Sequence, residues 1–381
     1  MSEKFLPLGV QDFETMQTSN FIYVDKTEYI YQLIRPSQAY YFLSRPRRFG
    51  KSLLVSTLGY LFQGRKDLFE GLWIDKNTDW QWKKFPVVKI DFDRISHENP
   101  EQLKKGLLQT IKESADDNEI KIKFKSELLL ENFCVLITEL KKKNKSHVVV
   151  LIDEYDKPVI THLGKGKEEL ETAKQNHDML MQFLGVLKAH DISSALRLVF
   201  ITGVSKLSWG NMFSGLNNLN DLSWQSKFAS FLGYTKNELE NNFGNNISKL
   251  SRYLDINYEE CLLKLQSWYN GYRFTDSQEK VCNPFSILNV FQDQEFKNYW
   301  FETGASSFLK NLIRENDFPI PENESLQLTD DIFSTYEPEN LHLEAFLFQT
   351  GHITITDCDD IFFHLNYPNQ EVKTSFLKYI K

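Results

Sequence analysis

Residues 40–52, with the sequence Tyr-Tyr-Phe-Leu-Ser-Arg-Pro-Arg-Arg-Phe-Gly-Lys-Ser, decide the fold of this chain. The aromatic and apolar start of the stretch predicts a buried strand, and residues 53–62 have the pattern of an amphipathic helix. A strand, a short loop ending in Gly-Lys-Ser and then a helix form the order in which phosphate-binding P-loops occur. Backbone N–H groups at the start of a helix, together with its dipole, favour an anion there. We therefore expect Lys51 to reach the β- and γ-phosphates of a nucleotide and the Ser52 hydroxyl to bind Mg²⁺.

The loop departs from the generic pattern G-x-x-x-x-G-K-[ST] at one position. The first glycine of that pattern falls on Arg45, so the loop lacks a residue that would ease its turn. Gly-Lys-Ser by itself is common by chance, and an ordinary surface loop is the alternative interpretation. The residues expected around the phosphates are Arg45, Pro46, Arg47, Arg48, Phe49, Gly50, Lys51, Ser52 and Leu53.

Length and composition indicate a globular protein of two or three domains. The chain has 381 residues, of which 41% are hydrophobic and 25% charged, and its net charge is −8. This charge provides no general attraction for DNA, so DNA binding would need a local basic patch. The four cysteines form no C-x-x-C pair, so neither a zinc site nor a disulfide framework is expected. With no secretion signal and no apolar run that could span a bilayer, the sequence predicts a cytoplasmic protein without a membrane partner.

A second informative stretch is residues 148–156, Val-Val-Val-Leu-Ile-Asp-Glu-Tyr-Asp. Its β-branched run predicts a strand of a parallel sheet that is buried on both faces. Carboxylates at the end of such a strand are costly unless they have a partner. Mg²⁺ would be that partner for Asp153, and Glu154 would deprotonate the attacking water, which makes Glu154 and Lys51 the predicted catalytic residues. The alternative is a strand end with two solvated acids.

A further buried strand is predicted at residues 196–203, and polar residues follow its end. Ligands of open α/β sheets bind at the carboxyl ends of the strands. Thr202 or Ser205 could therefore contact the γ-phosphate, although an ordinary turn around Gly203 explains them nearly as well. We expect the P-loop strand to lie beside this strand, with the strand of Asp153 next outward.

The predicted architecture is an α/β P-loop NTPase fold, AAA- or STAND-like, in which helices flank a parallel sheet. A second strand is predicted at residues 85–92 and a fifth at residues 228–234, with a loop at 212–221. A capping box at Thr235–Glu238 opens a helical region, in which Arg273 could face the γ-phosphate but is more simply a salt-bridge or surface arginine. A linker at 314–335, a helix at 341–350 and a two-stranded hairpin at 353–365 suggest a small winged-helix-like module. The expected segments are an N-terminal segment at 1–39, the ATPase domain at 40–234, a helical lid at 235–313, and the linker with the winged-helix-like module at 314–381.

Several motifs together resemble one family. They are the Arg-Pro-Arg-Arg-Phe-Gly-Lys-Ser loop and the stretches at 23–27, 153–156, 201–206, 213–219, 268–274 and 347–351. The chain resembles a bacterial AAA-ATPase-like family whose members often end in a PD-(D/E)XK nuclease-like domain. The resemblance implies ATP binding and hydrolysis, and it implies that Arg45 is usual for the family's loop. The sequence stops at Lys381, where longer relatives continue, so the nuclease-like domain is expected to be missing and no DNA cleavage is expected.

Three functional hypotheses follow. The first is a Mg²⁺-dependent ATPase in which hydrolysis drives movement of the C-terminal modules. The second is a nucleotide-gated interaction protein with little turnover, which closes on a protein partner or on a second copy of the chain. The third is a DNA-associated ATPase in defence or mobile-element biology, suggested by the relatives with nuclease-like domains.

Overall fold

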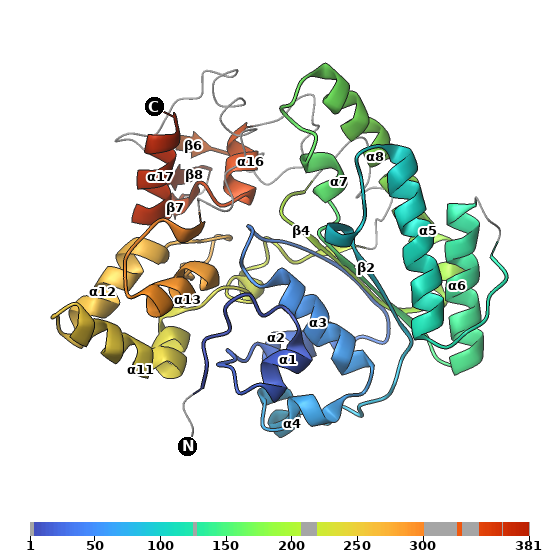
Figure 1. Cartoon of the computed structure of the whole chain (residues 1–381), viewed down its shortest axis with the longest axis horizontal. Helices are drawn as coiled ribbons and strands as arrows, with labels where there is room; N and C mark the ends of the chain where they lie inside the picture. Colours follow the sequence, from blue (N-terminus) through green and yellow to red (C-terminus); the bar gives the residue numbers. More distant parts are fainter. Residues whose placement is uncertain are drawn as a thin grey trace.

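The computed structural model describes residues 4–124, 128–206, 219–300, 326–329, 343–359 and 361–380. Its centre is a parallel sheet (Figure 1). The sheet has five strands in the order β2-β3-β4-β1-β5. The strands are β1 (Ala39–Ser44), β2 (Val87–Asp91), β3 (Val148–Asp153), β4 (Leu196–Gly203) and β5 (Asn220–Asp221). This order confirms that the P-loop strand β1 lies beside β4 and that β3 lies next outward.

Helices cover both faces of this sheet. Helix α3 (Lys51–Phe62) lies on one face, and α5 (Pro100–Asp117), α6 (Leu129–Asn144) and α8 (Lys167–Gly185) lie on the other (Figure 1), as right-handed crossovers between parallel strands require. Every residue of β3 and β4 is buried, which explains their uninterrupted apolar sequence. The shorter helices here are α1 (Phe13–Thr18), α2 (Thr27–Ile34), α4 (Trp73–Asn77), α7 (Lys157–Ile160) and α9 (His190–Ser193).

A helical region with its own hydrophobic core follows the sheet. It consists of α11 (Lys236–Tyr253), α12 (Tyr258–Tyr269) and α13 (Pro284–Asp293). The predicted capping box is present, because the Thr235 hydroxyl accepts from the Glu238 N–H while the Glu238 carboxylate accepts from the Thr235 N–H.

The C-terminal module packs on the sheet domain. Its described elements are β6 (Leu326–Leu328), α16 (Leu343–Gln349), β7 (Thr354–Cys358), β8 (Phe363–Asn366) and α17 (Gln370–Ile380). Buried residues of this module, such as Leu347, Ile355 and Val372, belong to the same hydrophobic cluster as the strands of the parallel sheet. The C-terminal module therefore shares a core with the P-loop strand, whereas the helical region does not.

Two sequence predictions about strands are wrong. The fifth strand is Asn220–Asp221, which lay in a predicted loop, and not residues 228–234. Phe228 and Phe231 are three residues apart and both pack on Tyr29, so this segment turns instead of extending. Residues 326–328, expected in a linker, form β6, which pairs with β8 and makes the predicted two-stranded hairpin three-stranded. The motif residues 213–218, and residues 301–325, lie outside the described part of the chain.

Within the described residues, no helix is both long and apolar enough to cross a membrane.

Candidate functional site

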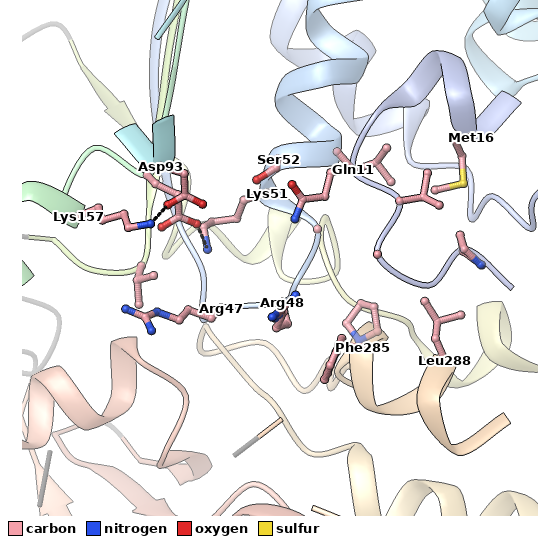
Figure 2. Close-up of a pocket in the computed structure, with 18 of the residues that line it drawn as sticks. Gln11, Met16, Arg47, Arg48, Lys51, Ser52, Asp93, Lys157, Phe285 and Leu288 are labelled. Atoms are coloured by element: carbon pink, nitrogen blue, oxygen red, sulfur yellow. Dashed lines mark hydrogen bonds and ion pairs between the residues drawn. The ribbon is translucent and has the colours of Figure 1, made fainter. Parts of the chain in front are cut away.

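A cavity of about 430 Å³ opens where β1 leads into α3 (Figure 2). The loop and the first three residues of α3 line it on one side, and the ends of the parallel strands provide Asp93, Glu154, Asp156 and Val204. The N-terminal segment from Pro7 to Met16 and the start of α13 complete the walls. The cavity therefore lies at the carboxyl edge of the sheet, where ligands of open α/β sheets bind.

The backbone of the loop turns sharply into α3. Arg48 has φ 69° and Gly50 has φ 94°, both in the left-handed region. A Cβ atom on Gly50 would meet no atom within 4 Å, so backbone conformation, not lack of space, favours glycine there. Phe49 is buried and packs edge-on against Tyr272 and Phe274, with ring centroids 4.9 and 5.4 Å away. This contact anchors the loop directly before the first residues of α3, which line the cavity.

Lys51 is held at the centre of the site. Its Nζ lies 3.2 Å from Glu154 Oε1, and it donates to the carbonyl oxygens of Arg45 and Pro46 at 3.2 and 3.3 Å. The side chain is almost fully buried, and its partners come from the loop and from the end of β3 (Figure 2). A phosphate entering the cavity would compete directly with Glu154 for this ammonium group.

Asp153 and Glu154 are brought to the same point by β3. Asp153 is 2% exposed, and burial raises its pKa to about 6 although the Ser52 hydroxyl, which donates to it, acts in the opposite direction. Glu154 has φ 50°, and its N–H donates to Asp153 Oδ1 at 3.0 Å. The strand thus ends in a left-handed residue that turns the Glu154 carboxylate toward Lys51.

Ser52 and Asp153 together fit a magnesium site. Mg²⁺ in phosphate-binding sites takes one or two protein oxygen ligands and completes its shell with water and phosphate oxygens. A hydroxyl hydrogen-bonded to a buried carboxylate is such a donor set. No group of three or more His, Cys, Asp and Glu side chains in the described residues could hold a metal by itself.

Thr202 and Ser205 are not part of the cavity lining in the described structure. Thr202 is fully buried, and its hydroxyl donates to the Leu43 carbonyl at 2.6 Å, which links β4 to β1. The Ser205 hydroxyl donates to Asp156 Oδ2 at 2.7 Å. Both hydroxyls therefore donate hydrogen bonds that connect strand ends. This agrees with the alternative interpretation, in which these residues belong to an ordinary turn around Gly203.

No role for Asp156 was predicted from the sequence. Its carboxylate accepts from the N–H groups of Val204 and Ser205 as well as from the Ser205 hydroxyl. Complete burial raises its pKa. A Cβ on Gly203 would lie 2.4 Å from Asp156 Oδ1, so only glycine permits this close approach. Asp156 ties the end of β4 to the segment that follows β3.

The three arginines of the loop have different surroundings. Arg45 is buried and donates to the carbonyls of Ser44, Ser223 and Phe228, with its guanidinium carbon 4.4 Å from the centroid of Phe274. Burial lowers its pKa to about 9. We expected Arg45 among the phosphate-binding residues, but it does not line the cavity.

Arg47 and Arg48 do line the cavity. Both are exposed, and the Arg48 guanidinium lies over the ring of Phe285, 4.7 Å from its centroid. Pro46 is buried and packs near Gly351 of the C-terminal module, because a Cβ there would meet Pro46 Cγ at 2.8 Å. Leu53 lines the cavity as expected.

One ion pair at the cavity was not predicted. Lys157 at the start of α7 pairs with Asp93, which follows β2 (Figure 2). The only signal in the sequence was the acidic end of the second strand. Arg273, by contrast, is buried and does not line the cavity. Its side chain donates to the carbonyls of Thr275, Asp276 and Ser277 and to Cys358 Sγ of β7, so it joins its own turn to the C-terminal module.

Comparisons with known proteins agree with the loop and strand motifs. A family described as "Predicted AAA-ATPase" matches residues 7–213. A protein of Azotobacter chroococcum mcd 1, described as "Uncharacterized protein in vnfD 5'region", is 37% identical over 382 residues, which are 98% of this chain and 69% of that protein.

Two solved structures give weaker similarity. Drosophila ORC bound to DNA has a TM-score of 0.34 at 11% identity and covers 99% of this chain and 95% of its own. The ORC2 protein of Aeropyrum pernix, in ADPNP–ADP complexes, has a TM-score of 0.34 at 12% identity, with coverages of 93% and 90%. At this TM-score neither structure informs the function of this chain. The family match and the 37% identical relative show that the chain belongs to the predicted AAA-ATPase family.

Proposed function

We propose that this protein binds ATP with Mg²⁺ in the cavity and hydrolyses it. The observation that supports this most is the position of Lys51, which lies 3.2 Å from Glu154 beside the hydrogen-bonded pair of Ser52 and Asp153. A phosphate-binding cation, an oxygen pair suited to Mg²⁺ and a carboxylate able to accept a proton are the groups that phosphoryl transfer to water requires.

Each residue has one proposed role. Lys51 leaves Glu154 for the β- and γ-phosphates, and Glu154 then accepts a proton from a water molecule that attacks the γ-phosphorus. The bond between the γ-phosphorus and the β–γ bridging oxygen breaks, and ADP leaves with that oxygen. Ser52 and Asp153 would hold Mg²⁺, which would neutralise phosphate charge. The backbone N–H groups at the start of α3 orient the phosphates, as a helix N-terminus does for an anion.

The base of the nucleotide would lie at the apolar end of the site. A smaller cavity of about 80 Å³ adjoins Gly50 and is lined by side chains such as Met16, Tyr23, Leu53, Phe231 and Tyr234. These come from the N-terminal segment, the start of α3 and the residues before α11, so a bound base would bridge the sheet domain and the helical region. Movement of the helical and C-terminal modules with nucleotide state is part of this proposal.

A nucleotide-gated switch with little turnover is the second candidate. The ion pair between Lys51 and Glu154 favours it, because the carboxylate that would accept the proton of the water molecule is engaged by Lys51. The two functions differ in turnover but share the same binding site.

Phosphate release with Mg²⁺-ATP tests the proposal. We expect the wild type to turn over, and Glu154→Gln to lower turnover by about 100-fold or more while ATP binding is retained, because general-base catalysis contributes on this scale. Glu279→Gln, at an exposed site in a distant turn, should match the wild type. ATP binding without phosphate release by the wild type would favour the switch, and wild type that binds no ATP would refute both functions.

A further inference from the structure

Arg47 is the arginine of the loop that is available to the phosphate end of the cavity. Its side chain is exposed and lines the cavity, and no described residue forms an ion pair with it. Arg48 lies over Phe285 of α13, whereas Arg47 extends toward the side of Lys157 (Figure 2). The two arginines therefore serve opposite ends of the cavity.

The backbone of Arg47 is held by a residue far away in the sequence. Trp300 donates its indole Nε1–H to the Arg47 carbonyl at 3.0 Å. The indole is 2% exposed and packs between Tyr272 and His352, with centroid distances of 6.3 and 5.2 Å. A rigid, buried donor thus fixes the position of one peptide group in an otherwise exposed part of the loop.

Glu371 on α17 holds Trp300 in turn. Glu371 Oε1 accepts from the backbone N–H of Trp300 at 2.7 Å, and Oε2 accepts from the Ser286 hydroxyl of α13 at 2.8 Å. Glu371 is fully buried. One carboxylate therefore connects the C-terminal helix, the helical region and, through Trp300, the loop of the cavity.

We propose that Arg47 supplies positive charge to the terminal phosphates from within the same chain, and that Trp300, held by Glu371, is the positioning residue that fixes Arg47. This rests on the proposed function. An arginine that meets the γ-phosphate in the transition state is worth a large factor in turnover, because the phosphoryl oxygens carry the developing charge. The C-terminal module would set the rate of the site through the Trp300 contact.

The first test compares Arg47 with an exposed arginine outside the cavity. We expect Arg47→Gln to lower turnover at saturating Mg²⁺-ATP by about 100-fold and to reduce the preference for ATP over ADP in binding. Arg35→Gln, at the exposed end of α2 and outside the cavity lining, should change turnover by less than about threefold. If Arg47→Gln and wild type have equal turnover and an equal preference for ATP over ADP, the proposed role of Arg47 is wrong, but the proposed ATPase function stands. Wild type that binds no ATP would refute the proposed function as well.

The second test asks whether Trp300 acts through Arg47. Trp300→Phe removes the indole donor and keeps an aromatic ring, and we expect about a tenfold loss of turnover with ADP affinity unchanged. In the Arg47→Gln background the same change should have no further effect, since the two residues act as a unit. A full additional loss in the double variant would show that Trp300 acts elsewhere and would overturn its positioning role.

Conservative variants guard against misfolding. Glu371→Gln keeps an oxygen for the Trp300 N–H and should retain turnover within about threefold, whereas Glu371→Ala should resemble Trp300→Phe. Trp268→Phe, on α12 in the other hydrophobic core, is the matched control. Loss of turnover in Glu371→Gln equal to that in Glu371→Ala, with both folded by circular dichroism, would contradict the proposed connection.

Discussion

Arg45 and Arg47 are two residues apart in one loop, yet they have opposite surroundings. Arg45 is buried and bound to carbonyl groups, while Arg47 is exposed at the cavity. The carboxylates after β3 differ in another way, because Asp153 accepts from the Ser52 hydroxyl of the loop, whereas Asp156, although it lines the cavity, accepts from the backbone at the end of β4. The hydrogen-bond partners of a charged residue at this edge of the sheet, and not only its exposure to the cavity, therefore separate the residues that hold the strand ends together from the others.

The largest effect on stability is expected for Asp156→Ala. This change leaves the N–H groups of Val204 and Ser205 buried without their acceptor, so the free energy of unfolding should fall by about 4 kcal/mol. Asp153→Asn is the matched variant, because it removes a charge that burial disfavours, and it should be at least as stable as the wild type. Urea unfolding measures both. Equal destabilisation by the two changes would contradict the division between them.

The second effect concerns the arginines. Arg45→Met should lower the free energy of unfolding by about 3 kcal/mol, since the carbonyls of Ser223 and Phe228 lose a buried donor. Arg47→Met should change it by less than about 0.5 kcal/mol, as surface substitutions usually do. Thermal and urea unfolding provide the comparison. A destabilisation by Arg47→Met as large as that by Arg45→Met would show that both arginines are structural.

The sequence was sufficient for four of the five strands of the sheet and for the Gly-Lys-Ser residues that line the cavity. Apolar strand runs and the Gly-Lys-Ser loop depend on local patterns, so the predicted parallel order β3-β4-β1 is confirmed. The direction in which the polar side chains point was not predictable from the sequence. Thr202 and Arg45 are polar residues at a strand end and in the loop, and only the packing of segments far apart in the sequence, such as Phe228 beside Arg45, decides which way they turn. Trp300 had no signal at all, because its contact spans 253 positions.

The third effect is a pH dependence from Glu371. Burial raises the pKa of this carboxyl to about 7 from the usual 4.5. Below about pH 4.5 this carboxyl is protonated in both the folded and the unfolded chain, so it does not change the free energy of unfolding with pH. As pH rises toward 7, the carboxyl ionises in the unfolded chain before it does in the folded chain, and the free energy of unfolding therefore falls. We expect the free energy of unfolding to fall by about 2 kcal/mol between pH 5 and pH 7.5 from this group.

Glu371→Gln should remove that contribution and flatten the pH profile of stability. The exposed Glu279→Gln is the control and should leave the profile unchanged. Urea unfolding at pH 5, 6, 7 and 7.5 measures the slope. The same pH profile in wild type and Glu371→Gln would mean that the folded chain does not raise the pKa of Glu371, which would contradict the prediction.

The smallest effect is expected for Thr202→Val. The hydroxyl donates to Leu43 O, so its loss should cost about 1 kcal/mol of stability and leave turnover unchanged. Phosphate release and thermal unfolding of the same preparation measure both quantities. A loss of turnover of tenfold or more at unchanged stability would return Thr202 to the phosphate-sensing role that the sequence suggested.

Binding of the phosphates by Lys51 is tested most directly by calorimetric titration of Mg²⁺-ATP into three proteins. Wild type and the exposed control Lys188→Ala should bind with equal affinity. Lys51→Ala should bind about 100-fold more weakly, or about 3 kcal/mol, because the phosphates lose a charge-assisted partner at the helix start. Equal affinity of Lys51→Ala and wild type would show that Lys51 does not bind the phosphates, and no binding by the wild type would show that the cavity is not an ATP site.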